Sequence, residues 1–94
     1  MEKQYFVYIL ECNDNSLYTG ITIDFSKRIK RHTGGKGSKY VRSRLPIKTA
    51  WLTLAMPKSD ALKLEYKIKQ LSKNKKVKFL CDHYQKQIKD KNNE

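Results

Sequence analysis

Five side chains in the sequence have the types and the spacing to take part in one reaction: Tyr8, Tyr18, Arg28, His32 and Glu65. Cleavage of a phosphodiester needs a base for the attacking water, a cation beside the non-bridging oxygens and a metal ion on the leaving oxygen. Tyrosine or histidine can supply the base, arginine the cation and glutamate a hard oxygen ligand. The set therefore suits phosphodiester cleavage with Glu65 as the metal ligand.

Taken singly, each of these residues favours a structural explanation. A buried tyrosine usually finds a hydrogen-bond partner within the protein, and a histidine on a helix face is more often structural than catalytic. An arginine near the core usually has a carboxylate partner, and Arg28 with Glu65 would form such a pair. Only the occurrence of all five residues together indicates a site.

The kind of metal follows from the ligand types. A single carboxylate, with water and phosphate oxygens completing the shell, suits one Mg²⁺ or Mn²⁺ ion. The sequence lacks the histidine and cysteine cluster that binds zinc, because Cys12 and Cys81 stand far apart and are expected to be ordinary core residues. It also lacks a P-loop and a G-x-G-x-x-G motif, so we expect no nucleotide cofactor.

Two strands are expected to hold the tyrosines. The β-rich runs Tyr5–Leu10 and Leu17–Thr22 flank a turn-forming segment, which predicts an antiparallel hairpin. The first run is apolar without alternation, which indicates a strand covered on both faces. Gly20 in the second run weakens a strand unless another group must approach its backbone closely.

A helix from Phe25 to His32 is expected to follow, with Asp24 as N-cap and Gly34-Gly35 at its end. One face of this helix carries four residues at positions i, i+3, i+4 and i+7: Phe25, Arg28, Ile29 and His32. Because the two apolar residues must pack on the sheet, we expect Arg28 and His32 to point toward the sheet or its edge rather than to water.

The charge of the chain points to a polyanionic partner. Lysine and arginine number 21 against 9 acidic residues, a net charge of +12, which favours nucleic acid first and an acidic membrane surface second. Residues 34–44 are expected to be a loop rich in glycine and cations, interrupted by Tyr40, which suits a phosphodiester strand. The predicted phosphate contacts, which position DNA without reading bases, are Lys27, Lys36, Lys39 and Arg42.

The remaining elements complete the predicted fold. A strand over Ile47–Ala55 precedes a helix that starts at residues 57–60 with Ser59 as N-cap, and Glu65 borders its apolar stripe of Ala61, Leu64, Ile68 and Leu71. A third helix over 75–86 is expected to bury Val77, Leu80, Cys81 and Tyr84. The order ββαβαα predicts an α/β (α+β) sandwich, with a central three-stranded antiparallel sheet flanked by helices.

The length of 94 residues suits a single domain, expected over residues 1–88 with a polar, disordered tail at 89–94. The N-terminus leads straight into a strand without a secretory signal, and no apolar run approaches the roughly 18 residues of a membrane span. We therefore expect a cytoplasmic protein without a membrane partner.

These motifs resemble the GIY-YIG endonuclease superfamily over nearly the whole chain. Phe6-Val7-Tyr8 stands where the first triad would be and Tyr18-Thr19-Gly20 where the second would be, and the match continues through residues 27–32, 34–40 and 61–65. The chain resembles the small stand-alone branch, similar to the nuclease subunit of the eukaryotic structure-specific resolvase. The triads depart from the pattern at Phe6, Val7 and Thr19, positions that are structural.

The resemblance implies a metal-dependent endonuclease that cuts DNA by its structure, in repair or recombination. Glu65 would hold the ion, Tyr8 or Tyr18 would orient or deprotonate the water, Arg28 would stabilise the pentavalent phosphate, and His32 would assist as base or phosphate ligand. Which of them is the base stays open. Because relatives usually carry a second domain, two alternatives also stay open: a non-catalytic nucleic-acid-binding module, and a nuclease subunit activated by a protein partner.

Overall fold

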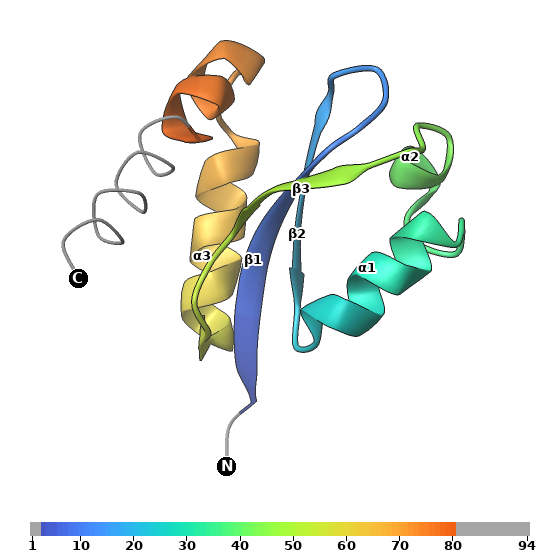
Figure 1. Ribbon diagram of the computed structural model, residues 1–94. Helices are drawn as coiled ribbons and strands as arrows, with labels where there is room; N and C mark the ends of the chain where they lie inside the picture. Colours follow the sequence, from blue (N-terminus) through green and yellow to red (C-terminus); the bar gives the residue numbers. More distant parts are fainter. Residues whose placement is uncertain (1–2, 81–94) are drawn as a thin grey trace, which may run out of the picture.

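Strand β1 (Gln4–Glu11) is the centre of the fold in the computed structural model, which describes residues 3–80. It pairs antiparallel with β2 (Leu17–Thr22) on one side and with β3 (Lys48–Leu52) on the other. Residues 7–10 are buried, because helix α3 covers one face of the sheet and α1 and α2 cover the other (Figure 1). The predicted α/β class, the hairpin and the strand covered on both faces are thus confirmed.

Helix α1 (Phe25–Thr33) begins and ends where the sequence predicts. The side chain of Asp24 accepts a hydrogen bond from the backbone nitrogen of Lys27 at 3.1 Å, which satisfies one free donor of the first turn. Gly34 closes the helix, and Gly35 follows with φ of 75°. Phe25 and Ile29 pack against Tyr8 and Leu10 of the sheet, so the predicted apolar face is confirmed.

The segment predicted as a plain loop at residues 34–44 contains a short helix, α2 (Lys39–Arg42). The hydroxyl of Ser38 caps it by accepting a hydrogen bond from the backbone nitrogen of Val41 at 3.2 Å. The side chain of Val41 is fully buried beside Tyr8 and Leu10. The prediction of a loop was wrong here because one capped turn brings one apolar side chain into the core.

The third strand is shorter than predicted, and a fourth strand follows it. After β3 the backbone bends at Thr53, whose nitrogen donates to the Val7 carbonyl and whose hydroxyl accepts from the Val7 nitrogen, each at 2.9 Å. Strand β4 (Met56–Pro57) then pairs with residues 4 and 5 of β1. The predicted strand over Ile47–Ala55 was therefore wrong in its extent, and the sheet has four strands rather than three.

Helix α3 (Lys58–Lys69) starts directly after β4, with Pro57 as its N-cap and no side-chain cap. The prediction of Ser59 as N-cap was wrong because Ser59 already lies in the first turn. Three residues of the apolar stripe are confirmed, since Ala61 and Ile68 are fully buried and Leu64 packs against them. Leu71 lies beyond the end of α3 and is only partly buried.

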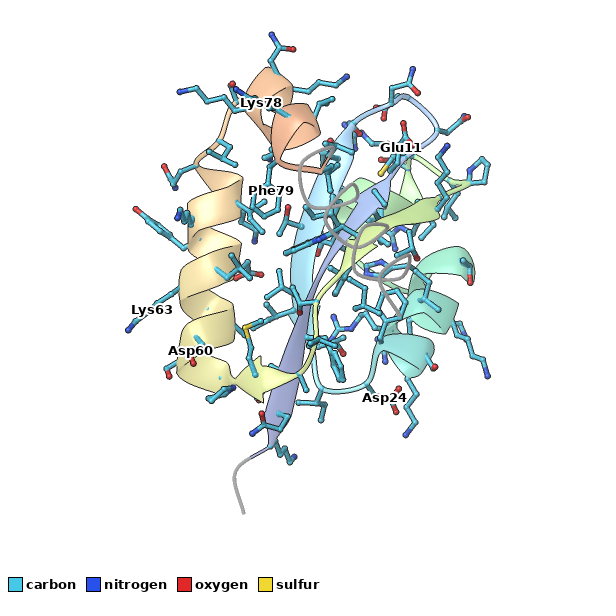
Figure 2. All side chains as sticks on the ribbon, turned by 60° about the vertical axis from the view of Figure 1, so that its left-hand side comes forward. Glu11, Asp24, Asp60, Lys63, Lys78 and Phe79 are labelled. Carbon is cyan, nitrogen blue, oxygen red and sulfur yellow. The ribbon has the colours of Figure 1, made fainter. Side chains whose placement is uncertain are left out.

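Residues 73–80 form a further helix. Phe79 points toward the sheet and its ring packs edge-on against Trp51 at 5.1 Å, whereas Lys78 points outward (Figure 2). Val77 is 46% exposed, so its predicted burial was wrong, while Leu80 packs against the core as predicted. The predicted burial of Cys81 and Tyr84, the end of this helix and the tail at 89–94 lie outside the described residues.

Within residues 3–80, no helix combines the length and the apolar character that crossing a bilayer requires.

Candidate active site

A buried hydrogen bond between Tyr8 and His32 is the centre of the candidate site. The hydroxyl oxygen of Tyr8 on β1 lies 3.1 Å from Nε2 of His32 on α1. Both side chains are only 1% exposed. The strand and the helix are locked against each other by the packing of Phe25 and Ile29, so the geometry of the pair is fixed by the core.

Gly20 makes room for the Tyr8 ring. Strand pairing places Gly20 directly opposite Tyr8, and a β-carbon at position 20 would lie 2.6 Å from Cζ of that ring. No side chain other than hydrogen fits between β2 and the phenol. The predicted reason for a glycine inside this strand, close approach of another group to its backbone, is therefore confirmed.

Tyr18 lies on the solvent side of the pair. It is half-buried, and its ring meets the edge of the His32 ring at a centroid distance of 5.5 Å. It shares a sheet face with Tyr8, since Leu10 and Tyr18 are paired across the hairpin, and the two tyrosine rings lie 6.4 Å apart. The structure thus brings Tyr8, Tyr18 and His32 into one aromatic cluster.

The charges of Arg28 and Glu65 both act on this cluster. Burial first, and then the neighbouring Tyr18, raise the pKa of Tyr8 to about 12; the positive charge of Arg28 opposes this rise and the negative charge of Glu65 adds to it. Arg28 comes from α1 and Glu65 from α3, on opposite faces of the sheet. The charges of both residues act on Tyr8. This tyrosine is paired with Gly20, which lies on the edge strand β2.

His32 is held neutral by its surroundings. Burial first, and then the charges of Arg28 and Arg31, lower the pKa of His32 below its ordinary value of 6.5. A neutral imidazole has one nitrogen free to accept a proton. The Tyr8 phenol and the His32 imidazole therefore form a neutral pair at neutral pH.

The prediction that Arg28 points to the sheet or its edge rather than to water was wrong in one respect. The residue is exposed to solvent, although its charge reaches Tyr8 and His32. Glu65, whose side chain is 19% exposed, forms an ion pair with Lys69 at 3.4 Å. Among the described residues no ion pair joins Arg28 to Glu65, so that structural explanation is not supported.

The family model of the GIY-YIG catalytic domain matches residues 4–78 of this chain. The chain belongs to the GIY-YIG family. It is 44% identical over 82 residues to the UPF0213 protein SSP2268 of Staphylococcus saprophyticus, a match that covers 87% of this chain and 99% of that relative. Such relatives place it among the small stand-alone members of the family.

Two solution NMR structures of relatives share the GIY-YIG fold of this chain. The UPF0213 protein BH0048 from Bacillus halodurans is 46% identical, with a TM-score of 0.55 and 83% of each chain covered. The protein EF2693 from E. faecalis is 31% identical, with a TM-score of 0.59, and the match covers 89% of this chain and 93% of that chain.

The donor set fits a metal ion of the kind that GIY-YIG nucleases use. No group of three or more histidine, cysteine, aspartate or glutamate side chains gathers anywhere in the part of the chain that the structure describes, so these residues form no protein cage for zinc or calcium. Mg²⁺ needs only one or two carboxylates, with waters and substrate oxygens as its other ligands. Glu65, partly exposed and close enough to influence Tyr8, meets that requirement.

The predicted phosphate contacts of this GIY-YIG domain are all exposed. Lys27 lies on α1, Lys36 in the segment before α2, and Lys39 and Arg42 on α2 itself. A hollow of about 500 Å³ lies away from them, where β4 meets the start of α3, and it includes none of the predicted site residues; its lining is Lys3, Tyr5, Pro57, Lys58, Ser59 and Leu62.

Three residues beside the site had no specific role in the sequence-based prediction. Tyr40 on α2 stacks on Tyr18 at 5.9 Å, and the guanidinium of Arg44 lies 3.8 Å over the Tyr40 ring. Gly37 lies against the imidazole of His32, because a β-carbon there would stand 2.9 Å from its Cε1. The only sequence signal was the aromatic ring of Tyr40 within a basic, glycine-rich segment.

Proposed function

We propose that this protein is a divalent-metal-dependent endonuclease that hydrolyses phosphodiester bonds in DNA, directed by DNA structure more than by sequence. The observation that carries the proposal is the buried Tyr8–His32 hydrogen bond with the charges of Arg28 and Glu65 acting on it. Membership of the GIY-YIG family, whose matched domain is a catalytic domain, supports the same reaction class.

In this proposal Tyr8 and His32 act together as the base. A phenol with a pKa near 12 is a poor base alone at neutral pH. The Tyr8 oxygen accepts a proton from the attacking water while its own proton passes to Nε2 of His32, which the lowered pKa keeps neutral. The water oxygen then bonds to phosphorus, the bond to the leaving oxygen breaks, and that oxygen takes up a proton from solvent water, while His32 later returns its proton to solvent. Tyr18, at the solvent side of the cluster, orients the water.

The two charged residues have complementary roles in the proposal. Arg28 is exposed, so it can bind the non-bridging oxygens of a phosphate arriving from solvent and stabilise the charge that develops in the transition state. Glu65 would hold one Mg²⁺ or Mn²⁺ ion, which when bound supplies charge stabilisation at the leaving oxygen. The exposed residues Lys27, Lys36, Lys39 and Arg42 contact backbone phosphates.

The biological setting of the reaction is also part of the proposal. The excess of positive charge supports a DNA partner. Cutting of branched or flapped DNA in repair or recombination, a cytoplasmic location and a targeting protein partner remain predictions from the resemblance and the composition.

The test is a cleavage assay with labelled branched, flapped and plain duplex DNA, in Mg²⁺, in Mn²⁺ and in EDTA. We expect cuts that require the metal and are lost in Glu65→Ala, while DNA binding persists because only a metal ligand is removed. Asp60→Asn is the matched control, since it removes an exposed carboxylate from the first turn of the same helix (Figure 2).

Loss of DNA binding in Glu65→Ala would contradict the role assigned to Glu65. Intact binding without cuts on any substrate, in either metal, would favour a non-catalytic module or a subunit that needs its partner. Binding that depends on salt but not on Mg²⁺, combined with the absence of any strand cuts, would support the non-catalytic module.

A further inference from the structure

The helix of residues 73–80 brings two lysines next to the candidate active site, and neither was among the predicted DNA contacts. Lys73 and Lys76 are one turn apart and therefore lie on the same side of this helix. Together with residues of the β1–β2 hairpin and α2 they line a hollow of about 210 Å³; the lining residues are Ser16, Leu17, Tyr40, Lys73 and Lys76. The helix lies at the same end of the sheet as the β1–β2 turn (Figure 1).

The lining of this hollow suits an anion. Of the described residues that line it, two carry ammonium groups, two carry hydroxyl groups and none is acidic, although the hydroxyl of Ser16 donates to the neighbouring Asp14. Neighbouring ammonium groups repel each other, and an anion placed between them removes that repulsion. The volume is below the roughly 300–1,000 Å³ of pockets that hold a whole small-molecule ligand, so the hollow suits a single group such as a phosphate.

One wall of the hollow is held rigidly and leads to the candidate active site. The Nε atom of Arg44 donates to Asp14 at 3.0 Å, and its guanidinium stacks on the ring of Tyr40 at 3.8 Å. The same Arg44 side chain donates to the Tyr40 carbonyl at 3.0 Å. The Tyr40 ring in turn stacks on Tyr18. A group bound in the hollow is therefore separated from the aromatic cluster by one side chain.

We propose that this hollow binds one backbone phosphate of the DNA strand that is cut, next to the phosphate at the active site. The inference rests on the proposed function, because it places a substrate strand at Tyr18. Lysine ammonium groups bind phosphate oxygens without reading bases. The bound phosphate fixes which bond of the strand lies beside Tyr8 and His32, so the hollow sets the position of the cut.

The test compares two double variants of the same helix, Lys73→Ala with Lys76→Ala and Lys75→Ala with Lys78→Ala. Both remove two lysines at the same spacing, but only the first pair lines the hollow. DNA binding is measured in EDTA over a salt series, with circular dichroism to check folding. We expect the first pair to weaken binding and to reduce the slope of log K against log salt by about 1, and the second pair to change the slope much less.

A second measurement locates the contact on the DNA. Single uncharged methylphosphonates are placed in turn along a labelled strand, and binding is measured in EDTA. We expect one position to weaken binding by the wild-type protein and to have no effect on the Lys73→Ala, Lys76→Ala variant. Equal slopes for the two double variants, or equal sensitivity of wild type and variant at every position, would overturn the proposal.

The failure of this proposal and that of the nuclease are distinguishable. If the wild-type protein cuts DNA but the two double variants bind alike, the hollow is not a phosphate site and the nuclease stands. If the wild-type protein cuts nothing but the first pair alone flattens the salt slope, the phosphate site stands and the nuclease does not.

Discussion

The ring of Tyr8 lies directly against the backbone of Gly20, so close that a β-carbon at position 20 would stand 2.6 Å from its Cζ atom. Strand pairing makes this contact unavoidable, because the two residues are opposite each other in the β1–β2 ladder. The position of the Tyr8–His32 hydrogen bond therefore depends on a residue that takes no part in it.

The substitution Gly20→Ala should displace the Tyr8 ring and lower the free energy of unfolding by about 1–3 kcal/mol, the cost of overpacking a dense core. Urea denaturation measures the change. In a Tyr8→Ala background the same substitution should cost much less, because the clashing ring is gone. An equal cost in both backgrounds would show that the contact does not carry the effect.

The variants Tyr8→Phe and His32→Gln should each abolish most of the cleavage, because each removes one partner of the proton-transfer pair. Since the two residues act as a unit, the double variant should lose no more activity than the worse single variant. Single-turnover rates in Mg²⁺ measure this. Losses that multiply in the double variant would show that the two residues act independently.

The same Tyr8→Phe substitution should also destabilise the fold, by about 1–3 kcal/mol, because it leaves Nε2 of His32 buried without its partner. Urea denaturation measures the free energy of unfolding. The control is Tyr40→Phe, which removes a phenol oxygen from a residue that is 38% exposed. Equal stability of the two variants would contradict the importance of the buried hydrogen bond.

The substitution Arg28→Ala should slow cleavage by about 10²–10³, the effect of removing one transition-state charge partner. It should also raise the pKa of His32, because the charge of Arg28 helps to lower it. NMR titration of the imidazole measures that shift. Lys30→Ala is the control, an exposed cation on the same helix; an unchanged rate in Arg28→Ala would count against the assigned role.

Stability should fall as the pH decreases from 6.5, and activity should fall at the lower pH where the folded His32 takes up its proton. The pKa of His32 is lowered from 6.5 in the folded protein, mainly by burial, so the unfolded chain binds more protons in that range. The free energy of unfolding therefore decreases as the pH falls from 6.5 toward the lowered pKa. Urea denaturation at about pH 7.5 and about pH 5.5 measures the change. The variant His32→Gln should show a smaller dependence.

The sequence predicted the elements that carry the candidate site residues where local chemistry decides the structure. Asp24 caps α1, Gly34 ends it, and the spacing of Phe25, Ile29 and His32 puts all three on the sheet side. The turn between β1 and β2 fixes the hairpin register, and so the placement of Tyr8 opposite Gly20. These signals lie within a few residues of the features that they determine.

Predictions failed where distant packing decides. The helix of residues 73–80 is turned so that Phe79 meets Trp51, which leaves Val77 exposed, although the apolar pattern alone favours its burial. Pro57 joins β4 by pairing with Gln4, so α3 needs no serine cap. Arg28 is exposed although it lies on the apolar stripe of α1, because its charge is costly to bury. Trp51 and Gln4, the partners of Phe79 and Pro57, are both far from them in sequence.

The fluorescence of Trp51, which packs on Phe79, reports on the structure around this contact. Trp51 is the single tryptophan of the chain, it is 8% exposed, and it belongs to the core on the α3 side of the sheet. The Tyr8–His32 cluster lies on the opposite side, with α1. Tryptophan emission should therefore change when the protein unfolds or when the helix that carries Lys73 and Lys76 detaches from the sheet. It should change little when substrate or protons bind at the Tyr8–His32 cluster.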